Sequence, residues 1–480
     1  MEDENQELIQ FTEELHNLAD TSLQNVLWDK RSIYKIPASV TALNRTAYMP
    51  QTVSFGPYHH GEDHLKPMEE HKQRALRYYL IRSGRRLQEV VESLNEEIQV
   101  LKDSYDMLGE SWKDDKKKFL RLMILDGCFM LEIIRLATHS LDGYAANDPI
   151  FSSHGRLYIA PSIRRDMFLL ENQLPMLVLY KLVALESDGA QDEEFVNELV
   201  LNFCYPNAPV SKLDKSLHVL DLYRKSLILE DPAWKMRRPR VKWGLLNVVN
   251  DIFRSATGIT DAGIQFKKGK TKSLRGISFH GGVLELPVIV VDGATEATFL
   301  NLIAFERLHV GAGNEVTSYV SFMDNIIRNE RDFALLRSRG IIQNAIGSHM
   351  ATPQLFNSLS RDIAFLPNSS LEGVHMQVNS FCKMPWNECR ANLIHTYFRH
   401  PWAILCVIAA LILFALTGAQ TVYSIIPYYK SNHSTSPSPP MGFAAPPPLP
   451  TPTPPPLTPP MHPPRPSHRH HRCRCVRSNL

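Results

Sequence analysis

The chain lacks an excess of charge of either sign. Its 52 basic and 50 acidic residues leave a formal net charge of +2 over 480 residues. Proteins that bind nucleic acid through phosphate contacts usually carry a strong basic excess, so the balance predicts no nucleic-acid partner. Cysteine is also scarce. The seven cysteines are scattered along the chain, and none forms a CxxC pair. This argues against a disulfide framework and fits a body that folds in a reducing compartment.

Signatures of common reactions are missing as well. The sequence has no Gly-x-Ser-x-Gly elbow and no His-Glu-x-x-His metal motif. These patterns place a nucleophile or a pair of metal ligands in a defined geometry, and no grouping of Ser, His and Asp replaces them here. We therefore assign no catalytic residue, no cofactor and no metal from the sequence.

A positively charged leader followed by an apolar segment is not found at the N-terminus. The chain begins Met1-Glu-Asp-Glu and has no Lys or Arg before Lys30. A secretory signal peptide needs both features, so we expect the bulk of the chain to be made in the cytosol.

What the sequence does contain is one long stretch without Asp, Glu, Lys, Arg or His, from Pro401 to Tyr429. A helix needs about 20 apolar residues to cross the hydrocarbon core of a bilayer. We predict a single transmembrane helix over residues 401–426. The residues expected to anchor it in lipid include Trp402, Leu411, Phe414 and Ile426.

Charges beside this stretch favour one orientation. Arg390 and Arg399 precede it closely, whereas only Lys430 follows it nearby. Basic flanks tend to stay cytoplasmic, so we expect the body in the cytosol and the tail in the lumen or outside the cell, with the plasma membrane favoured. In that orientation Asn432, the first residue of an Asn-His-Ser sequon, is a candidate glycosylation site.

The composition changes abruptly in the tail. Sixteen of the 33 prolines lie between Pro437 and Pro466. Proline lacks an amide donor and fixes φ, so we expect residues 431–480 to be a disordered, extended spacer that ends in a basic His/Cys segment. If the tail were cytosolic, its Pro-Pro-Pro-Leu runs would suit an SH3- or WW-like partner.

Apolar spacing predicts a body that is mainly α with a small β-hairpin or sheet, an α+β fold. The predicted helices cover residues 5–28, 68–82, 86–107, 116–138, 166–185, 193–203, 213–229, 245–264, 296–307, 316–328, 331–338 and 350–360. Pro175 is expected to divide the helix over 166–185. The β signal is the run from Ile277 to Val291, where Gly281-Gly282 suits a hairpin turn.

The same pattern predicts the domain organisation. Residues 1–31 form an N-terminal helical segment and residues 32–395 a helical soluble domain. This domain has possible halves at 32–230 and 244–395, because the segment 231–243 contains two prolines and five basic residues and is typical of a loop.

One segment imitates a phosphate-binding loop. Gly269-Lys-Thr271 is followed by an apolar run that ends at Asp292. A true loop of this kind needs glycine at 264, but the glycine stands at 263, and the segment before it looks helical rather than extended. A nucleotide-dependent switch using residues 269–292 is therefore the weakest hypothesis.

Two polar regions leave a further alternative open. His59 and His60 are adjacent in a turn-rich segment, and Asp166 and Glu171 flank an apolar run. A hydrolase-like enzyme without a recognisable motif would use one of these regions, since a buried carboxyl can serve as a general acid. The simpler interpretation is that these polar groups bond the ends of the N-terminal helices to each other.

Several strings, taken in order, resemble a known plant family. They are Ile33-Tyr-Lys-Ile-Pro37, Tyr48-Met-Pro50, Val53-Ser-Phe-Gly-Pro-Tyr-His-His-Gly61, Met68-Glu-Glu-His-Lys72, Asp126-Gly-Cys-Phe-Met-Leu-Glu132, Asp166-Met-Phe-Leu-Leu-Glu-Asn-Gln-Leu-Pro175, Asn301-Leu-Ile-Ala-Phe-Glu306 and Gly340-Ile-Ile342. Together they resemble the family catalogued as domain of unknown function 247, over roughly residues 32–420. Its motif residues in this chain are Gly56, Pro57, Tyr58, His59, His60, Glu171, Asn172, Gln173 and Pro175.

The resemblance implies a plant-specific protein, rich in helix, with one late membrane span and no established catalytic residues. Some members are associated with pollen–stigma self-incompatibility in grasses and others with stress responses. The resemblance therefore favours a membrane-anchored, non-enzymatic interaction or signalling protein with an unknown protein partner. The proline-rich tail departs from the short ending that is usual in the family.

Overall fold

The computed structural model describes residues 28–138, 143–204, 215–229, 254–345, 351–361, 369–397 and 401–431, together with the single residues 11, 213 and 363. It divides into two units, Met1–Ile404 and Leu405–Leu480. Apart from residues 11, 28 and 431, the predicted N-terminal helix over 5–28, the basic loop 231–243 and the tail 431–480 lie outside the described residues. These expectations therefore stay predictions.

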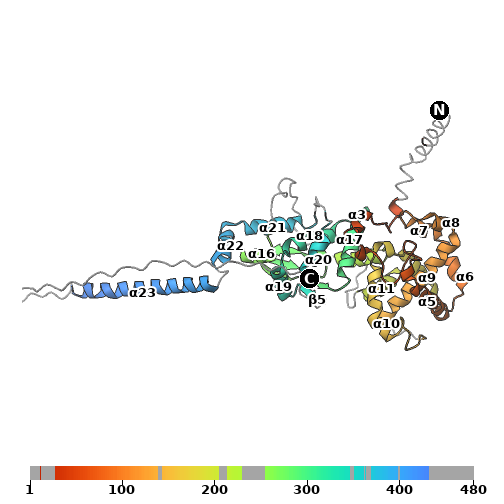
Figure 1. Cartoon of the computed structure of the whole chain (residues 1–480), viewed down its shortest axis with the longest axis horizontal. Coiled ribbons are helices and arrows are strands. Elements are labelled where there is room, and N and C mark those ends of the chain that lie inside the picture. Colours follow the sequence, from red (N-terminus) through yellow and green to blue (C-terminus); the bar gives the residue numbers. More distant parts are fainter. Residues whose placement is uncertain are drawn as a thin grey trace, which may run out of the picture. The chain divides into compact units, whose positions relative to one another are not determined.

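Helix dominates the first unit, as predicted, and 65% of the structure is helical (Figure 1). Its helices are α3 (Ala38–Thr41), α4 (Arg45–Tyr48), α5 (Pro67–Ser83), α6 (Leu87–Asn95), α7 (Ile98–Asp103), α8 (Glu110–Asp114), α9 (Lys116–Thr138), α10 (Ser153–Tyr158), α11 (Ala160–Met167), α12 (Met176–Glu186), α13 (Glu193–Cys204), α14 (Val219–Ile228), α16 (Ala256–Asp261), α17 (Thr295–Leu308), α18 (Glu315–Ile326), α19 (Glu330–Ser338), α20 (Ala351–Ser360), α21 (Glu372–Cys382) and α22 (Pro385–Tyr397), with 3-10 turns η1 (Asp63–Leu65), η2 (Leu170–Asn172) and η3 (Leu274–Gly276). Pro175 does divide the helix predicted over 166–185, and α12 begins directly after it.

Several predicted helices are wrong in their extent. The helix predicted over 213–229 begins only at Val219, as α14. The segment 86–107 forms two helices, α6 and α7, and the second ends at Asp103. The reason is a long-range pairing. The amide of Ile33 donates to the Ser104 carbonyl at 2.9 Å, and the Asp106 amide donates to the Ile33 carbonyl at 2.8 Å. These bonds draw residues 104–106 out of the helix and into a bridge with Ile33.

Within the described ranges the β structure is small and comprises two sheets. Strand β3 (Val283–Leu286) lies between β1 (Gln265–Lys268), to which it is parallel, and β2 (Ser278–His280), to which it is antiparallel. Gly281 and Gly282 form the predicted hairpin turn with φ of 56° and 78°, values that favour glycine. Strand β4 (Ile289–Val291) pairs in parallel with β5 (Ile342–Asn344).

The segment before Gly263 is helical, as expected, but its helix ends earlier than predicted. The helix predicted over 245–264 is described from residue 254 on, where α16 ends at Asp261. Gly263 follows with φ of 100°, a left-handed conformation that stops a helix. The chain then continues as β1.

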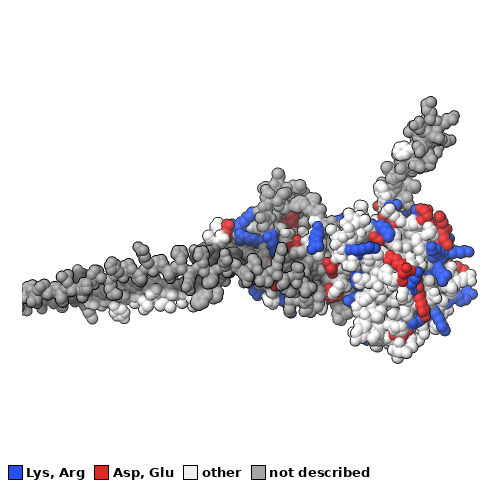
Figure 2. Space-filling view, in the orientation of Figure 1, with Lys and Arg blue, Asp and Glu red and all other residues white. Residues whose placement is uncertain are grey.

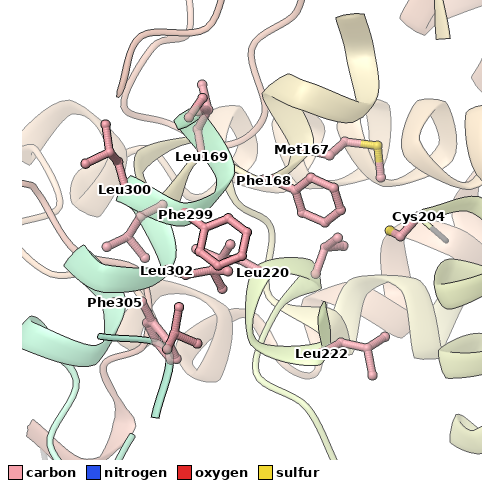
Figure 3. Close-up of a cluster of buried hydrophobic side chains, with 14 of the residues drawn as sticks. Met167, Phe168, Leu169, Cys204, Leu220, Leu222, Phe299, Leu300, Leu302 and Phe305 are labelled. Atoms are coloured by element: carbon pink, nitrogen blue, oxygen red, sulfur yellow. The ribbon is translucent and has the colours of Figure 1, made fainter. Parts of the chain in front are cut away.

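The two possible halves of the body share one hydrophobic core. Figure 3 shows Phe168 and Leu220 from the first half close to Phe299 from α17 in the second half. All three side chains are buried. Side chains from both sides of the basic loop therefore stabilise one another.

The second unit contains most of α23 (Pro401–Ser431). Its segment Leu405–Pro427 has a mean hydropathy of 2.2, and none of it is buried. The hydroxyls of Thr417, Thr421 and Ser424 each donate to the carbonyl four residues earlier at 2.8 Å. These three hydroxyls are thus satisfied within the helix, as a nonpolar environment requires.

A second segment passes the same test of length and composition only as a bent pair. It joins α11 to the stretch Leu170–Glu186 with an angle of 106°. Its apolar side chains, including Ile163, Leu170 and Val178, lie in the core of the body. In the part of the chain that the structure describes, α23 is therefore the helix that combines the length of a span with full exposure.

Candidate functional site

The family motif residues come from two segments that are more than a hundred positions apart in the chain. The loop 53–61 and the stretch 166–175 lie against each other, and we call the residues at their junction the motif cluster: Gly56, Pro57, Tyr58, His59, Asp166, Glu171, Asn172 and Gln173. The Phe55 amide donates to Asn172 Oδ1 at 2.7 Å. The Gly56 amide donates to Asp126 Oδ2 at 2.8 Å.

Gly56 is required at the closest approach of the two segments. Its φ is 72°, and a Cβ built on it would lie 2.8 Å from the Gln173 carbonyl oxygen and 2.8 Å from the Tyr105 hydroxyl. The Tyr105 hydroxyl itself donates to that carbonyl at 3.0 Å. Both the backbone conformation and the lack of space therefore exclude a side chain.

Asp166 holds the start of the loop. One of its carboxylate oxygens accepts bonds from the amides of Gln51, Thr52 and Val53 at 3.0, 2.6 and 3.1 Å. Burial raises the pKa of Asp166 above its usual value, and the three backbone donors counteract part of that effect. The carboxylate stabilises the backbone of a segment that has no helix or sheet to bond it.

The carboxamides of Asn172 and Gln173 are also used internally. Asn172 Nδ2 donates to the carbonyls of Val53 and Asp166, each at 3.0 Å. Gln173 Nε2 donates to the carbonyls of Met167 and Leu169 at 2.6 and 2.8 Å. Its Oε1 accepts from the Leu220 amide at 3.1 Å. Their donors and acceptors therefore join the loop, α11, η2 and α14.

Glu171 and His59 form the most polar part of the cluster. Glu171 Oε1 accepts from the Ile36 amide at 2.7 Å, and Oε2 accepts from Lys35 Nζ at 2.9 Å. His59 is 4% exposed, and its Nδ1 lies 2.7 Å from Glu62 Oε1. Its Nε2 is 3.7 Å from Glu171 Oε2 and has no hydrogen-bond partner. This nitrogen is the one unsatisfied atom that the structure records in the cluster.

Other motif residues play separate parts. The Tyr58 hydroxyl donates to the Asp106 carbonyl, and burial raises its pKa. His60 does not join His59: it is exposed, and its ring forms a T-shaped contact with Trp112. Pro175 precedes α12 with φ of −55°, which suits the start of a helix.

Sequence reasoning did not identify the buried ion pair beneath the cluster. Lys72 is fully buried, and its Nζ lies 2.7 Å from Asp126 Oδ1 and 2.7 Å from Glu69 Oε1. It also donates to the Ser54 carbonyl at 2.7 Å. The available signal was an aspartate in the otherwise apolar stretch that becomes α9, since a buried charge needs a partner.

The second half contributes two comparable polar connections. Asn301 Oδ1 accepts from the Leu170 amide at 2.8 Å, and its Nδ2 donates to the Ala47 carbonyl at 2.9 Å. Glu306 accepts from Arg224 Nε at 2.9 Å and from the amides of Val316 and Thr317 at 3.0 and 2.9 Å. Both residues lie in strings that carry the family resemblance. They connect α17 to η2, α4, α14 and α18.

The segment that imitates a phosphate-binding loop has another geometry. The Gly269 amide donates to the Leu286 carbonyl at 2.6 Å, as part of the sheet. The loop leads into η3, which has three residues, and not into a long helix whose N-terminus would face a phosphate. Asp292 accepts from the Ala294 amide at 3.0 Å and from Thr295 Oγ1 at 2.8 Å, next to the start of α17. These contacts give both ends of the segment a structural role.

Charges are interleaved on the face of the first unit drawn in Figure 2, over the region of α5–α8. Arg86 Nε is 2.8 Å from Glu89 Oε1, and Lys113 Nζ is 2.8 Å from Glu110 Oε1.

Among the described residues, no group of three or more His, Cys, Asp or Glu is arranged to hold a metal ion. One small apolar pocket lies between Ile36, Leu300 and Leu359.

The residues expected to anchor the span lie in α23. Leu411, Phe414 and Ile426 are 64%, 80% and 49% exposed. Trp402 lies in the first turn of the same helix. Asn432 lies outside the described residues.

Comparison with known proteins supports the resemblance. A family model described as "plant protein of unknown function" matches residues 33–416. The UPF0481 protein At3g47200 of Arabidopsis thaliana is 31% identical over 445 residues, which cover 87% of this chain and 90% of the relative. The putative UPF0481 protein At3g02645 of the same plant is 21% identical over 490 residues, covering 82% of this chain and 90% of the relative. No solved structure matches the chain.

Proposed function

Since this chain belongs to the plant family catalogued as domain of unknown function 247, we propose that it is a membrane-anchored, non-enzymatic interaction protein. Its helical body presents a surface to a protein partner, in recognition or stress signalling as the family resemblance implies. The observation that carries the anchoring part is the exposure of α23.

A core helix of similar composition would be covered by other parts of the protein. The segment Leu405–Pro427 is as apolar as such a helix, yet none of it is buried. Covering one large aliphatic or aromatic side chain is worth about 1.5–3 kcal/mol. A bilayer is the simplest environment that covers all sides of a single helix at once.

The non-enzymatic part is supported by the way the motif cluster uses its polar atoms. The Asp166 carboxylate and the carboxamides of Asn172 and Gln173 bond the protein's own backbone. Catalytic groups need at least one polar atom that faces the substrate. In these three side chains the polar atoms bond the protein's own backbone instead and so stabilise the fold.

A second candidate, a hydrolase-like enzyme, is favoured by one observation. His59 Nε2 is buried and lacks a hydrogen-bond partner, while the other ring nitrogen is bonded to Glu62. A histidine oriented by a carboxylate, with its second nitrogen free, is the arrangement of a general base. Glu171, whose Oε2 lies 3.7 Å from that nitrogen, would then adjoin the reacting groups.

Proximity labelling in plant tissue separates the two candidates. The full-length chain would carry a labelling enzyme and would be compared with its His59→Gln and Glu171→Gln variants. An interaction protein keeps the same labelled partners at a temperature at which the variants are folded. In a second measurement, the unaltered chain and the variants are incubated with a labelled metabolite pool. If the variants lose a product that the unaltered chain forms, and keep the same partners, the enzyme is favoured.

Membrane anchoring is tested by extraction of the full-length chain with alkaline carbonate. The chain should stay in the pellet, and a Leu411→Arg/Phe414→Arg variant should move to the supernatant, because each arginine at the centre of a span costs about 2.5–3.5 kcal/mol. Val310→Arg is the matched control, since Val310 is 94% exposed in a loop of the body. Release of the unaltered chain by carbonate contradicts the proposal.

We place the body in the cytosol and the tail in the lumen or outside the cell. The support is the pair of arginines before the span, Arg390 and Arg399, against the single Lys430 after it. A glycosylation sequon engineered far into the tail tests this arrangement better than Asn432, which lies close to the membrane. Sensitivity of the tagged chain to an endoglycosidase is expected, and its absence would favour the opposite orientation and a cytosolic SH3- or WW-like partner for the tail.

A further inference from the structure

Helix α22 exposes large apolar side chains just before the span begins in the sequence. Trp386 is 82% exposed and Leu393 is 50% exposed. They are seven residues apart, so they lie within about 20° of each other around the helix. Met384, which directly precedes the helix, is 52% exposed as well. Exposed apolar groups that gather on one face usually mark a contact surface.

The opposite side of α22 is attached to the body. Ala391 is buried, and the helix packs against α16 and α21. Asn387 Nδ2 donates to the Phe381 carbonyl at 2.9 Å, which fixes the start of α22 to the end of α21. Ala391 lies about 140° from Trp386 around the helix, so the apolar face points away from the body.

The length of chain between α22 and α23 limits what can cover this face. Only residues 398–400 separate Tyr397 from Pro401. The four steps from one residue to the other extend at most about 14 Å. The segment that would cross the bilayer begins at Leu405. If α23 crosses a membrane, the end of α22 must therefore stay near the same lipid–water interface.

The chemistry of the face suits that location. Tryptophan is enriched at membrane interfaces, where its apolar ring and its N–H group both find partners. We propose that α22 is an interfacial helix whose Trp386–Leu393 face contacts the headgroup region of the bilayer that α23 crosses. This inference rests on the proposed membrane anchoring.

Quenching of tryptophan fluorescence by brominated lipids tests the contact. The full-length chain is reconstituted in vesicles of phosphatidylcholine and phosphatidylserine, with or without bromine on acyl carbons near the headgroup. Three variants are measured beside the unaltered chain: Trp386→Phe, Trp402→Phe and Trp112→Phe. The emission lost in each variant gives the quenching of that one residue. Trp112 belongs to the body, where α8 lies at the end of the first unit opposite α22 (Figure 1).

The three residues make the outcomes distinguishable. Trp402 reports insertion of the span, and Trp386 reports the contact of α22. We expect roughly half or more of the emission of both to be quenched, and that of Trp112 to be unchanged, because quenching acts only at the depth of the bromines. Quenching of Trp402 without Trp386 overturns the inference and leaves the anchoring intact, and the face of α22 would then be open to a protein partner or a second copy. Quenching of neither residue overturns both.

Discussion

At the scale of single residues, the motif cluster depends on positions where one atom more or less changes the packing. Gly56 is the clearest case, and Gly56→Ala should destabilise the body by about 2–4 kcal/mol, from the left-handed φ and the clash with the Gln173 carbonyl together. Gly61→Ala is the matched control, since Gly61 has φ of 89° but nothing within 4 Å of the added carbon. Urea unfolding of both variants measures the difference. Equal losses of stability would show that the close approach at Gly56 is unimportant.

A second residue-scale prediction concerns pH. Burial lowers the pKa of His218 to about 4, despite the nearby Asp221 carboxylate. Its Nε2 donates to the Ser32 carbonyl at 3.0 Å, while Nδ1 accepts from the Asp221 amide at 3.2 Å, as a neutral ring can. In the unfolded chain this group has a pKa of 6.5, so between pH 6.5 and 4 the unfolded chain binds a proton that the folded chain does not. The contribution of this group to the free energy of unfolding is therefore highest above pH 6.5 and decreases as the pH falls through that window.

The effect of His218 is isolated by comparison with a variant. His218→Asn keeps an acceptor for the start of α14 but does not titrate. Over the window from pH 6.5 to 4 its stability should fall less than that of the unaltered chain, by up to about 3 kcal/mol. Thermal unfolding at several pH values measures this, with the exposed His280→Asn as the control. Parallel pH profiles for His218→Asn and the unaltered chain would contradict the assignment.

At the scale of elements, Glu306 joins three helices. Its carboxylate accepts from two amides at the start of α18 and from Arg224 of α14, whose side chain is 5% exposed. Glu306→Gln leaves part of a buried charge uncompensated and should cost about 3 kcal/mol. Hydrogen exchange of the Val316 and Thr317 amides should accelerate by the factor that corresponds to this loss of free energy. Glu330→Gln, in the exposed first turn of α19, should change neither quantity.

Elements that depend on local pattern could be predicted from the sequence. The apolar spacing of residues 116–138 coincides with α9, and α13, α17 and α18 begin and end within two residues of their predicted limits. The end of α7 and the strand β1 could not be predicted in the same way. Both are fixed by distant partners, the Ile33 bridge and β3. Pairings of this kind leave no periodic signal in the segment itself.

The candidate site shows the same division. The strings around His59 and Glu171 could be recognised as family features, but their meeting joins loops more than a hundred residues apart. The bonds from Asn172 and Gln173 to backbone carbonyls depend on where those carbonyls lie after folding. Residue type predicts that a buried carboxamide will be bonded, and only the fold determines to what.

At the scale of the whole molecule, the two halves of the body are expected to unfold together. Phe299 of α17 is buried beside Phe168 and Leu220 of the first half (Figure 3). Phe299→Ala should therefore destabilise both halves, by about 3–5 kcal/mol. Leu157→Ala is the control, because Leu157 is 65% exposed on α10.

Hydrogen exchange during urea unfolding of the full-length chain in detergent can follow each half separately. Peptides from α9 in the first half and α18 in the second half should lose protection at one urea concentration, and Phe299→Ala should shift both midpoints equally. Two separate transitions, with only the α18 peptides shifted, would mean that the halves are independent domains. A body that unfolds as one unit gives α22 and its Trp386 face a rigid attachment, so that a partner bound anywhere on the body is held at a fixed place relative to that helix.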